Sequence, residues 1–383
     1  MKRTKGALFL FLLLVLCALH VEAQVTIEIR KVPAKTPPSD TLYLAGNVNN
    51  WKTRSASFAF RKAANNRYYL TLPPREGELE YKVTRGSWET GETLANGAGR
   101  GNRFYQVKPG KDTVRIEVEN WQDNFPTATK THTATPNVKI LSNEFWMPQL
   151  KRSRRIWLYL PPNYASSDKK YPVLYMHDGQ NLFDAFYGFS GEWGVDESLN
   201  QMFQSEGQEV IVVGVDNGGE ERMNEYSPWK NAKHGGGQGD AYVDFLVQTL
   251  KPYIDKHYRT LTGPEHTGVA GSSMGGLISM YAALKYPQVY GKAGVFSPAF
   301  WVAPQVYDYA AKTKPSKDLK LCLVAGAKEG KEMVPDMARM RDLLVKQGLK
   351  PSSLKYQVHA DGEHKESFWQ REFPDVFRWL FSN

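Results

Sequence analysis

The sequence GVAGSSMGGLISMYAALKYP, residues 268–287, decides the fold because it joins a strand to a helix through a serine flanked by glycines. The residues before it, HTGVAGS, form a strand-like run, and a helix-like run follows the glycines. Gly271 to Gly275 form a Gly-x-Ser-x-Gly pattern centred on Ser273. In a nucleophile elbow the serine occupies a tight, strained turn, so glycines are needed two positions before and after it. The pattern alone also fits a glycine-rich turn without chemistry, but its strand–helix context favours a nucleophile at Ser273.

A serine nucleophile needs backbone N–H groups that stabilise an oxyanion. The N–H of Met274, at the start of the predicted helix, supplies the first. The second comes from the loop after the strand YPVLYMHD, where Gly179 lets the backbone turn. Either Gly179 or Gln180 can donate it, and the sequence does not decide between them. We interpret His177, at the end of that strand, as a structural residue beneath the site.

A serine hydroxyl also needs a base that is oriented by an acid. Two histidines follow Ser273, namely His359 and His364. His364 lies in the loop ADGEHKESFW between the last predicted strand and helix, where a base can project. His359 falls inside the strand KYQVH and is the alternative. We therefore predict His364 as the base.

The acid should follow the strand LKLCLVAG, because the chain order in α/β-hydrolases is serine, acid, histidine. Glu329 comes first after that strand and is our prediction, although two lysines flank it as they would a solvated acid. Glu332 and Asp336 lie further on. Asp361 is near His364 in sequence, but its position along the chain fits the order less well.

The 383 residues divide by pattern into two domains. Residues 24–120 consist of short β-rich runs separated by Gly, Pro and Asn, which predicts a small immunoglobulin-like β-sandwich. Residues 121–137, rich in Thr, Ala and Pro, are expected to be a linker. From residue 138 to 383, apolar strands alternate with helices. We predict an α/β fold there, with a mostly parallel sheet covered by helices on both faces.

The N-terminus predicts export. Basic residues precede an apolar run, and small residues end it near Ala23, as in a cleaved secretory signal peptide over residues 1–23. Cys17 raises the alternative of lipidation, but Leu16 is too bulky for that site. Only Cys322 survives processing, so no intrachain disulfide is expected, and a secreted or periplasmic bacterial protein fits. The net charge of +9 is scattered, which excludes a nucleic-acid patch, and no segment is predicted to span a membrane.

Several motifs together resemble the secreted esterases of the esterase-D and feruloyl-esterase-like α/β-hydrolase family, which neighbours the enterochelin esterases. They are MHDGQNLFD, GEWGVDESLN, EYSPW, YVDFLVQTLKPYIDKHYRT, GSSMGG, SPAFW and GEHKESFW. The resemblance covers roughly Val138 to the C-terminus. It implies Ser273 as nucleophile, His364 as base and Glu329 at the acid position, where many members have Asp.

The first domain has its own resemblance, to the early-set sandwiches and starch-binding modules of carbohydrate-active enzymes. It rests on LYLAGNVNNW, ELEYKVTRGSWET and GNRFYQV. In the starch-binding modules two tryptophans and a lysine form a sugar platform, and Trp51, Lys82 and Trp88 fall on those positions. Indole faces stack on sugar rings, and a lysine donates hydrogen bonds to hydroxyls. The alternative is that these tryptophans close the sandwich core and the domain is structural.

The expected reaction is acyl transfer in two steps from an ester to Ser273 and then to water, which requires no metal or cofactor. With an exported chain and a carbohydrate-module-like domain, we expect feruloyl or acetyl groups on plant polysaccharide or oligosaccharide. The alternatives are a siderophore ester, a mycolyl-type acyl transfer, and a carbohydrate-binding protein with a silent hydrolase domain. Aromatic residues expected near the mouth of the site are Phe183, Trp193, Tyr226, Trp229, Phe300 and Trp301.

Overall fold

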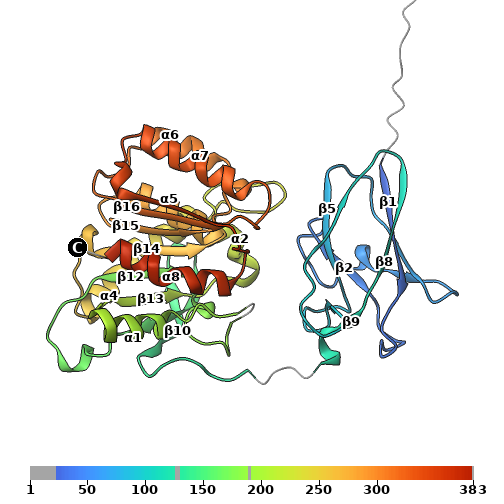
Figure 1. Ribbon diagram of the computed structural model, residues 1–383, viewed down its shortest axis with the longest axis horizontal. Coiled ribbons are helices and arrows are strands. Elements are labelled where there is room, and N and C mark those ends of the chain that lie inside the picture. The colour runs from blue at the N-terminus through green and yellow to red at the C-terminus, as the bar shows by residue number, and fades with distance from the viewer. Residues whose placement is uncertain (1–22, 126–129, 189–190, 382–383) are drawn as a thin grey trace, which may run out of the picture. The chain divides into compact units, whose positions relative to one another are not determined.

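The computed structural model describes residues 23–125, 130–188 and 191–381 (Figure 1). The predicted signal peptide lies outside the described residues except for Ala23. The chain divides into two compact units, residues 1–129 and 130–383. Each unit has its own apolar core.

The first unit is built from short strands in three sheets. A four-stranded sheet has the order β3-β4-β1-β8, a three-stranded sheet the order β2-β5-β7, and β6 pairs with β9. The strand β1 is antiparallel to β4 and parallel to β8. The strands are β1 (Gln24–Lys31), β2 (Tyr43–Gly46), β3 (Arg61–Lys62), β4 (Tyr68–Thr71), β5 (Glu78–Thr84), β6 (Glu92–Thr93), β7 (Arg103–Gln106), β8 (Lys111–Glu117) and β9 (Asn120–Trp121).

Alternation along the strands builds the core of this unit. Val25, Ile27 and Ile29 of β1 point to one side and are fully buried. Leu79, Tyr81 and Val83 of β5 do the same from the three-stranded sheet and join the same cluster. A period of two is what places every second side chain on one face of a strand. The two larger sheets of the unit therefore share one apolar core.

The second unit contains an eight-stranded mixed sheet with the order β10-β11-β13-β12-β14-β15-β16-β17. The strands β10 and β11 run antiparallel to their neighbours, and the strands from β13 to β17 pair in parallel. The strands are β10 (Val138–Met147), β11 (Arg152–Tyr159), β12 (Val173–His177), β13 (Ile211–Val215), β14 (Thr267–Ser272), β15 (Lys292–Phe296), β16 (Lys320–Gly326) and β17 (Leu354–His359).

Helices cover both faces of this sheet (Figure 1). Along β12, Val173 and Tyr175 join the core beneath α3 to α7, whereas Leu174 and Met176 join the core beneath α1 and α8. Strands buried on both faces explain the continuous apolar runs in the sequence. The helices are α1 (Val195–Glu206), α2 (Arg222–Glu225), α3 (Gly239–Phe245), α4 (Lys251–His257), α5 (Met274–Lys285), α6 (Gln305–Lys312), α7 (Met333–Lys346) and α8 (Glu366–Phe381), with a π-helical turn, Leu246–Leu250, between α3 and α4.

The ends of the predicted linker, residues 121–137, are held by the two units. Trp121 is fully buried in the core of the first unit. Lys130 donates a hydrogen bond to the Gly188 carbonyl (2.5 Å), and the Thr135 N–H donates one to Asp196 (2.8 Å), both within the second unit. The structure thus places the division of the chain at Thr129/Lys130.

Among the described residues, no helix is long and apolar enough to cross a membrane. Cys322 lies fully buried in β16, and burial raises the pKa of its thiol to about 12.

Candidate active site

The elbow predicted at Ser273 is present. Ser273 follows β14 directly and precedes α5, with φ 58° and ψ −119°. A positive φ is unusual for a residue with a side chain and costs on the order of 1–3 kcal/mol. The flanking glycines are needed sterically. A Cβ at Gly271 would lie 2.9 Å from the His177 ring, and one at Gly276 would lie 2.8 Å from the Phe296 carbonyl oxygen.

The turn leaves the hydroxyl of Ser273 free. Its own N–H donates to the Phe296 carbonyl (3.0 Å), and its carbonyl accepts from Leu277 and Ala299. In the described part of the chain, the hydroxyl has no hydrogen-bond partner. The N–H of Met274 stands at the first position of α5, where a helix offers no acceptor. The unbonded Ser273 hydroxyl and the free Met274 N–H are therefore adjacent.

The acid and base predicted from the sequence lie together. The Nδ1 atom of His364 is 2.7 Å from Oε2 of Glu329. The second oxygen of Glu329 accepts hydrogen bonds from the Ser297 hydroxyl (2.8 Å) and the Gly326 N–H (2.5 Å). The Glu329 side chain is fully buried, while that of His364 is 39% exposed. The carboxylate is thus fixed, and the imidazole it orients faces outward.

Close approach of two loops sets this geometry. A Cβ at Gly326, at the end of β16, would lie 2.2 Å from the backbone of Gly362 in the loop after β17. Two glycines at this point let the Glu329 and His364 loops touch. Edge-on packing of the His364 ring against Trp369 of α8, at 5.1 Å, supports the ring from the side.

Hydrogen bonds at the end of β15 connect the elbow to the Glu329–His364 pair. Ser273 donates its N–H to Phe296, and the next residue, Ser297, bonds Glu329 and accepts from the Trp369 indole (2.8 Å). The strands β14 to β17 are neighbours in the sheet and parallel, so their carboxyl ends meet at one edge. Among the described residues Ser273 and His364 form no hydrogen bond. Catalytic hydrogen bonds often tighten only when a substrate binds.

The loop predicted to hold the second oxyanion donor is shaped by Asp178 and Gly179. Asp178 has a left-handed backbone (φ 56°), and a 3₁₀ turn, Gly179–Asn181, follows. A Cβ at Gly179 would lie 2.9 Å from the backbone of Val215 and Asp216. The N–H groups of Gly179 and Gln180 have no acceptor among the described residues, so both stay available.

An ion pair that sequence reasoning missed anchors this loop. Arg222 contacts both oxygens of Asp178, at 2.7 and 2.8 Å, and Asn217 donates to the same carboxylate (2.7 Å). Burial acts to raise the pKa of Asp178, but the Arg222 charge and these hydrogen bonds bring it below the usual value. A Cβ at Gly275 would lie 3.3 Å from Asp178, so the pair supports the elbow. The segment EYSPW follows Arg222 closely in the sequence, but no sequence pattern there indicates that Arg222 pairs with Asp178.

The alternative bases and acids lie elsewhere. Nε2 of His359 is 3.0 Å from Glu372 of α8. Asp361 forms an exposed ion pair with Arg371. Asp336 lies in α7, and Glu332 is exposed at its start. Of the acids considered, only Glu329 contacts His364 among the described residues.

Most aromatic residues expected at the mouth are instead in the core. Trp193 is 2% exposed and packs against Phe296 and Trp369. Phe183, Tyr226 and Phe300 are fully buried. These four residues present almost no surface to a substrate, because their aromatic side chains fill the space between sheet and helices. The sequence does not distinguish an aromatic that packs from one that binds.

Trp229 and Trp301 have more exposure. Trp229 is half-buried and packs edge-on against Tyr281 and Tyr309. Trp301 is 53% exposed, with His234 edge-on at 5.4 Å. It follows Ala299, whose N–H bonds the Ser273 carbonyl at 3.0 Å. Trp301 is thus the most exposed of the predicted mouth aromatics.

In the first unit, Trp51 and Trp88 lie near each other, with ring centroids 6.4 Å apart at 39°. Both are half-buried, as is Lys82 of β5. Burial lowers the pKa of Lys82. The predicted sugar-platform tryptophans are therefore side by side and partly accessible.

His177 lies beneath the elbow, as interpreted from the sequence. It is 2% exposed, and its Nδ1 is 2.9 Å from the Tyr242 hydroxyl. Burial lowers its pKa to about 4. A catalytic base must contact solvent and substrate, which the buried His177 side chain does not do.

This burial predicts a loss of stability in acid. The folded pKa lies below the unfolded value near 6.5, so the unfolded chain binds more protons between the two values. Stability from this group is present above about pH 6.5 and lost as pH falls towards 4, by roughly 3 kcal/mol. Urea unfolding at about pH 7 and about pH 4.5 tests this against His177→Gln, which cannot titrate. Equal pH dependence in both proteins would contradict it.

The sheet order, the elbow after β14, and the Glu329–His364 pair on the loops after β16 and β17 are those of an α/β-hydrolase fold. Residues 148–380 match the Esterase family model, described as "Putative esterase", and the chain belongs to this family. It is a carboxylic ester hydrolase.

The chain is also similar to individual known proteins. "Uncharacterized protein YbbA" of Bacillus subtilis (strain 168) is 29% identical over 248 residues, covering 60% of this chain and 93% of the relative. An "Endo-1,4-beta-xylanase/feruloyl esterase" of Xylanibacter ruminicola is 24% identical over 171 residues, 43% of this chain and 22% of the relative. The enterobactin esterase FES of Shigella flexneri superposes with a TM-score of 0.52 at 15% identity, covering 89% of each chain. At that identity the last likeness concerns the fold alone.

Proposed function

We propose that this protein is an exported serine esterase that removes feruloyl or acetyl groups from plant polysaccharide or oligosaccharide through Ser273, His364 and Glu329. The observation that carries the catalytic part is the 2.7 Å contact between His364 and the buried Glu329, on loops beside the elbow. Export rests on the signal-like N-terminus, which predicts a secreted or periplasmic protein.

The mechanism follows from these contacts. Glu329 accepts a hydrogen bond from Nδ1–H of His364, which fixes the tautomer with Nε2 unprotonated and able to take the Ser273 hydroxyl proton. The serine oxygen attacks the ester carbonyl, and the Met274 N–H with Gly179 or Gln180 stabilises the oxyanion. His364 then protonates the leaving alcohol. Water, activated by the same imidazole, releases the acid and restores Ser273.

The proposed substrate class rests on two supports. The Xylanibacter relative carries feruloyl esterase in its name. Trp301 offers an exposed aromatic face on the loop bonded to Ser273, where a feruloyl ring or a sugar can stack. In the first unit, Trp51 and Trp88 would hold the polysaccharide chain as a second contact.

A panel of esters tests this proposal with the chain that begins at Gln24. Methyl ferulate, feruloylated arabinoxylan, acetylated xylan and a siderophore triester are compared by kcat/KM. We expect the highest value on a feruloyl or acetyl ester of a plant glycan. A preference for the siderophore triester would replace the substrate class, and no turnover of any ester would favour a binding protein with a silent hydrolase unit.

The same panel tests the tryptophan pair. Trp51→Ala should raise KM severalfold on the polymers and leave methyl ferulate hydrolysis unchanged, because a small ester does not reach a second contact. Trp146→Ala is the matched control, since Trp146 is 55% exposed on β10. Unchanged kinetics of Trp51→Ala on every polymer would contradict the platform.

A further inference from the structure

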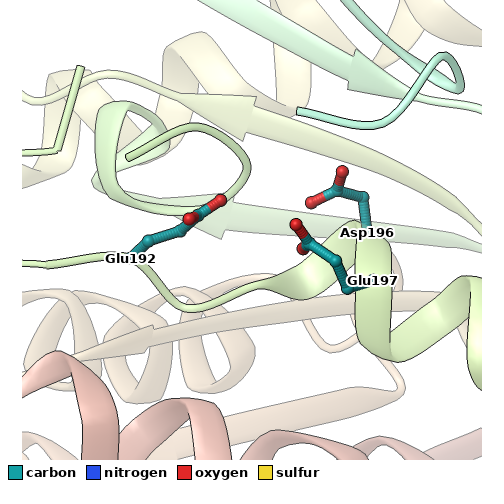
Figure 2. Close-up of side chains that lie close together, drawn as sticks. All are labelled: Glu192, Asp196 and Glu197. Atoms are coloured by element: carbon teal, nitrogen blue, oxygen red, sulfur yellow. The ribbon is translucent and has the colours of Figure 1, made fainter. Parts of the chain in front are cut away.

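Three carboxylates that do not belong to the Glu329–His364 pair converge at the start of α1. Glu192 approaches from the preceding loop, and Asp196 and Glu197 project from the first turn of the helix (Figure 2). One oxygen from each of the three lies within 4.8 Å of the others. This set has no part in the proposed ester hydrolysis.

The cluster is partly buried: Asp196 is buried, Glu192 is half-buried and Glu197 is exposed. Asp196 is fully buried, with 0% of its surface exposed. Its Oδ2 accepts the Thr135 N–H (2.8 Å), whereas its buried Oδ1 accepts no hydrogen bond from an N–H or a Ser, Thr or Tyr hydroxyl of the described residues. Glu192 repeats the pattern: one oxygen accepts from the Thr133 hydroxyl (2.9 Å), and the other is buried without a partner. A buried oxygen without a partner is costly and rare in native proteins.

No positive side chain balances these carboxylates. Within residues 23–125, 130–188 and 191–381, none of the three forms an ion pair with Lys, Arg or His. Asp184, which is also close to Glu192, is itself paired with His132 (2.8 Å). The N-terminus of α1 supplies only a partial positive charge. The described residues therefore supply no full positive charge to neutralise the three carboxylates.

We propose that Glu192, Asp196 and Glu197 bind a calcium ion. Calcium takes oxygen ligands at about 2.3–2.6 Å, so oxygens on opposite sides of one ion lie up to about 5 Å apart, which accommodates all three carboxylates. An all-oxygen, carboxylate-rich set suits a hard cation and not zinc or copper. Calcium also tolerates the irregular geometry and the waters that three protein ligands would leave, whereas magnesium demands a near-ideal octahedron.

The ion would join three segments of the second unit. Thr133 and Thr135 bond two of the ligands from the chain that leads into β10. Glu192 ends the loop that begins at the candidate oxyanion turn, and Trp193 donates its N–H to Asn181 (2.8 Å) in that turn. Calcium is thus expected to stabilise the second unit and this loop.

A shared proton is the competing explanation for the same geometry. Partial desolvation of its carboxyl group and a hydrogen bond with Asp196 raise the pKa of Glu197 to about 8, although the residue as a whole is exposed. A protonated Glu197 could bond the free Asp196 oxygen and remove the need for an ion. Calcium binding and its effect on melting separate the two explanations.

Calorimetry on the full chain after chelator treatment and desalting, with calcium chloride as titrant, is the direct test. We expect one calcium per chain and weak binding of magnesium. At a hundredfold excess over Kd, the melting temperature of the second unit should rise by roughly 5–10 °C. Asp196→Asn and Glu192→Gln keep the acceptors for Thr135 and Thr133 but should abolish this rise. Glu206→Gln, at the other end of α1, is the matched control and should keep it.

Wild-type protein that binds no calcium would overturn the proposal directly, whether or not any variant folds. A rise in melting temperature that Glu192→Gln and Asp196→Asn retain would place the ion elsewhere and also overturn it. The proposal does not depend on the ester chemistry, since Ser273→Ala should bind calcium like the wild type.

Discussion

Replacing Ser273 with alanine should lower kcat/KM on the best ester by about ten-thousand-fold or more while leaving the fold intact. Losses of this size are typical when the nucleophile of a serine hydrolase is removed, because the base and acid then have nothing to activate. The hydroxyl has no hydrogen-bond partner among the described residues, so its removal costs the folded state little. Alanine keeps the same backbone strain at φ 58°. Steady-state hydrolysis with thermal unfolding of the same samples measures both quantities.

Ser272 is a natural control for this experiment. It immediately precedes Ser273, but it is a buried β14 residue, 5% exposed, and it pairs with Phe296 of β15. Ser272→Ala removes the same atom one position earlier and should retain most activity. A fluorophosphonate should label the wild type at Ser273 and leave Ser273→Ala unlabelled. Loss of activity in Ser272→Ala, with Ser273→Ala still active, would move the nucleophile by one residue and contradict the elbow assignment.

Much of the hydrolase fold was predictable because its strands are buried on both faces. The runs YPVLYMHD, EVIVVGVDN and LKLCLVAG are continuously apolar, and each contains a strand of the mixed sheet. The segment GDAYVDFLVQTLKPYIDKHY has apolar residues at helical spacing, and the structure is helical there but contains the π-helical turn Leu246–Leu250. The short strands β3, β6 and β9 were missed, since two residues carry no periodicity.

The residues of the candidate site could be predicted where the order of serine, acid and histidine along the chain indicates them. Ser273, Glu329 and His364 each come directly after a strand, so the parallel topology alone brings their loops to one edge. The aromatic prediction failed for Trp193 and Phe300 because side-chain direction depends on tertiary packing that no local pattern encodes. Arg222 was missed for the same reason, since an isolated arginine gives no signal until Asp178 is placed beside it.

Glu329→Gln should lower kcat/KM by about a hundred- to ten-thousand-fold through the tautomer of His364. In the wild type, one carboxylate oxygen is held by the Gly326 N–H and the Ser297 hydroxyl, and the other accepts from His364 Nδ1. A glutamine has a single side-chain oxygen. The Ser297 hydroxyl and the Gly326 N–H both donate to that position, so they hold the oxygen there. Its NH₂ group then faces Nδ1 and can only donate to it. The proton moves to Nε2, which leaves the imidazole unable to accept the Ser273 proton.

Glu332→Gln and Asp361→Asn are the matched controls for this acid. Glu332 is three residues further along the same loop and exposed, and Asp361 is ion-paired with Arg371 near His364. Neither carboxylate contacts His364 among the described residues, so neither change alters Nδ1 and activity should stay within a few-fold of the wild type. Glu329→Asp should recover part of the loss, since a shorter carboxylate still accepts from Nδ1. If Asp361→Asn were as damaging as Glu329→Gln, the acid would have to be reassigned despite the 2.7 Å contact.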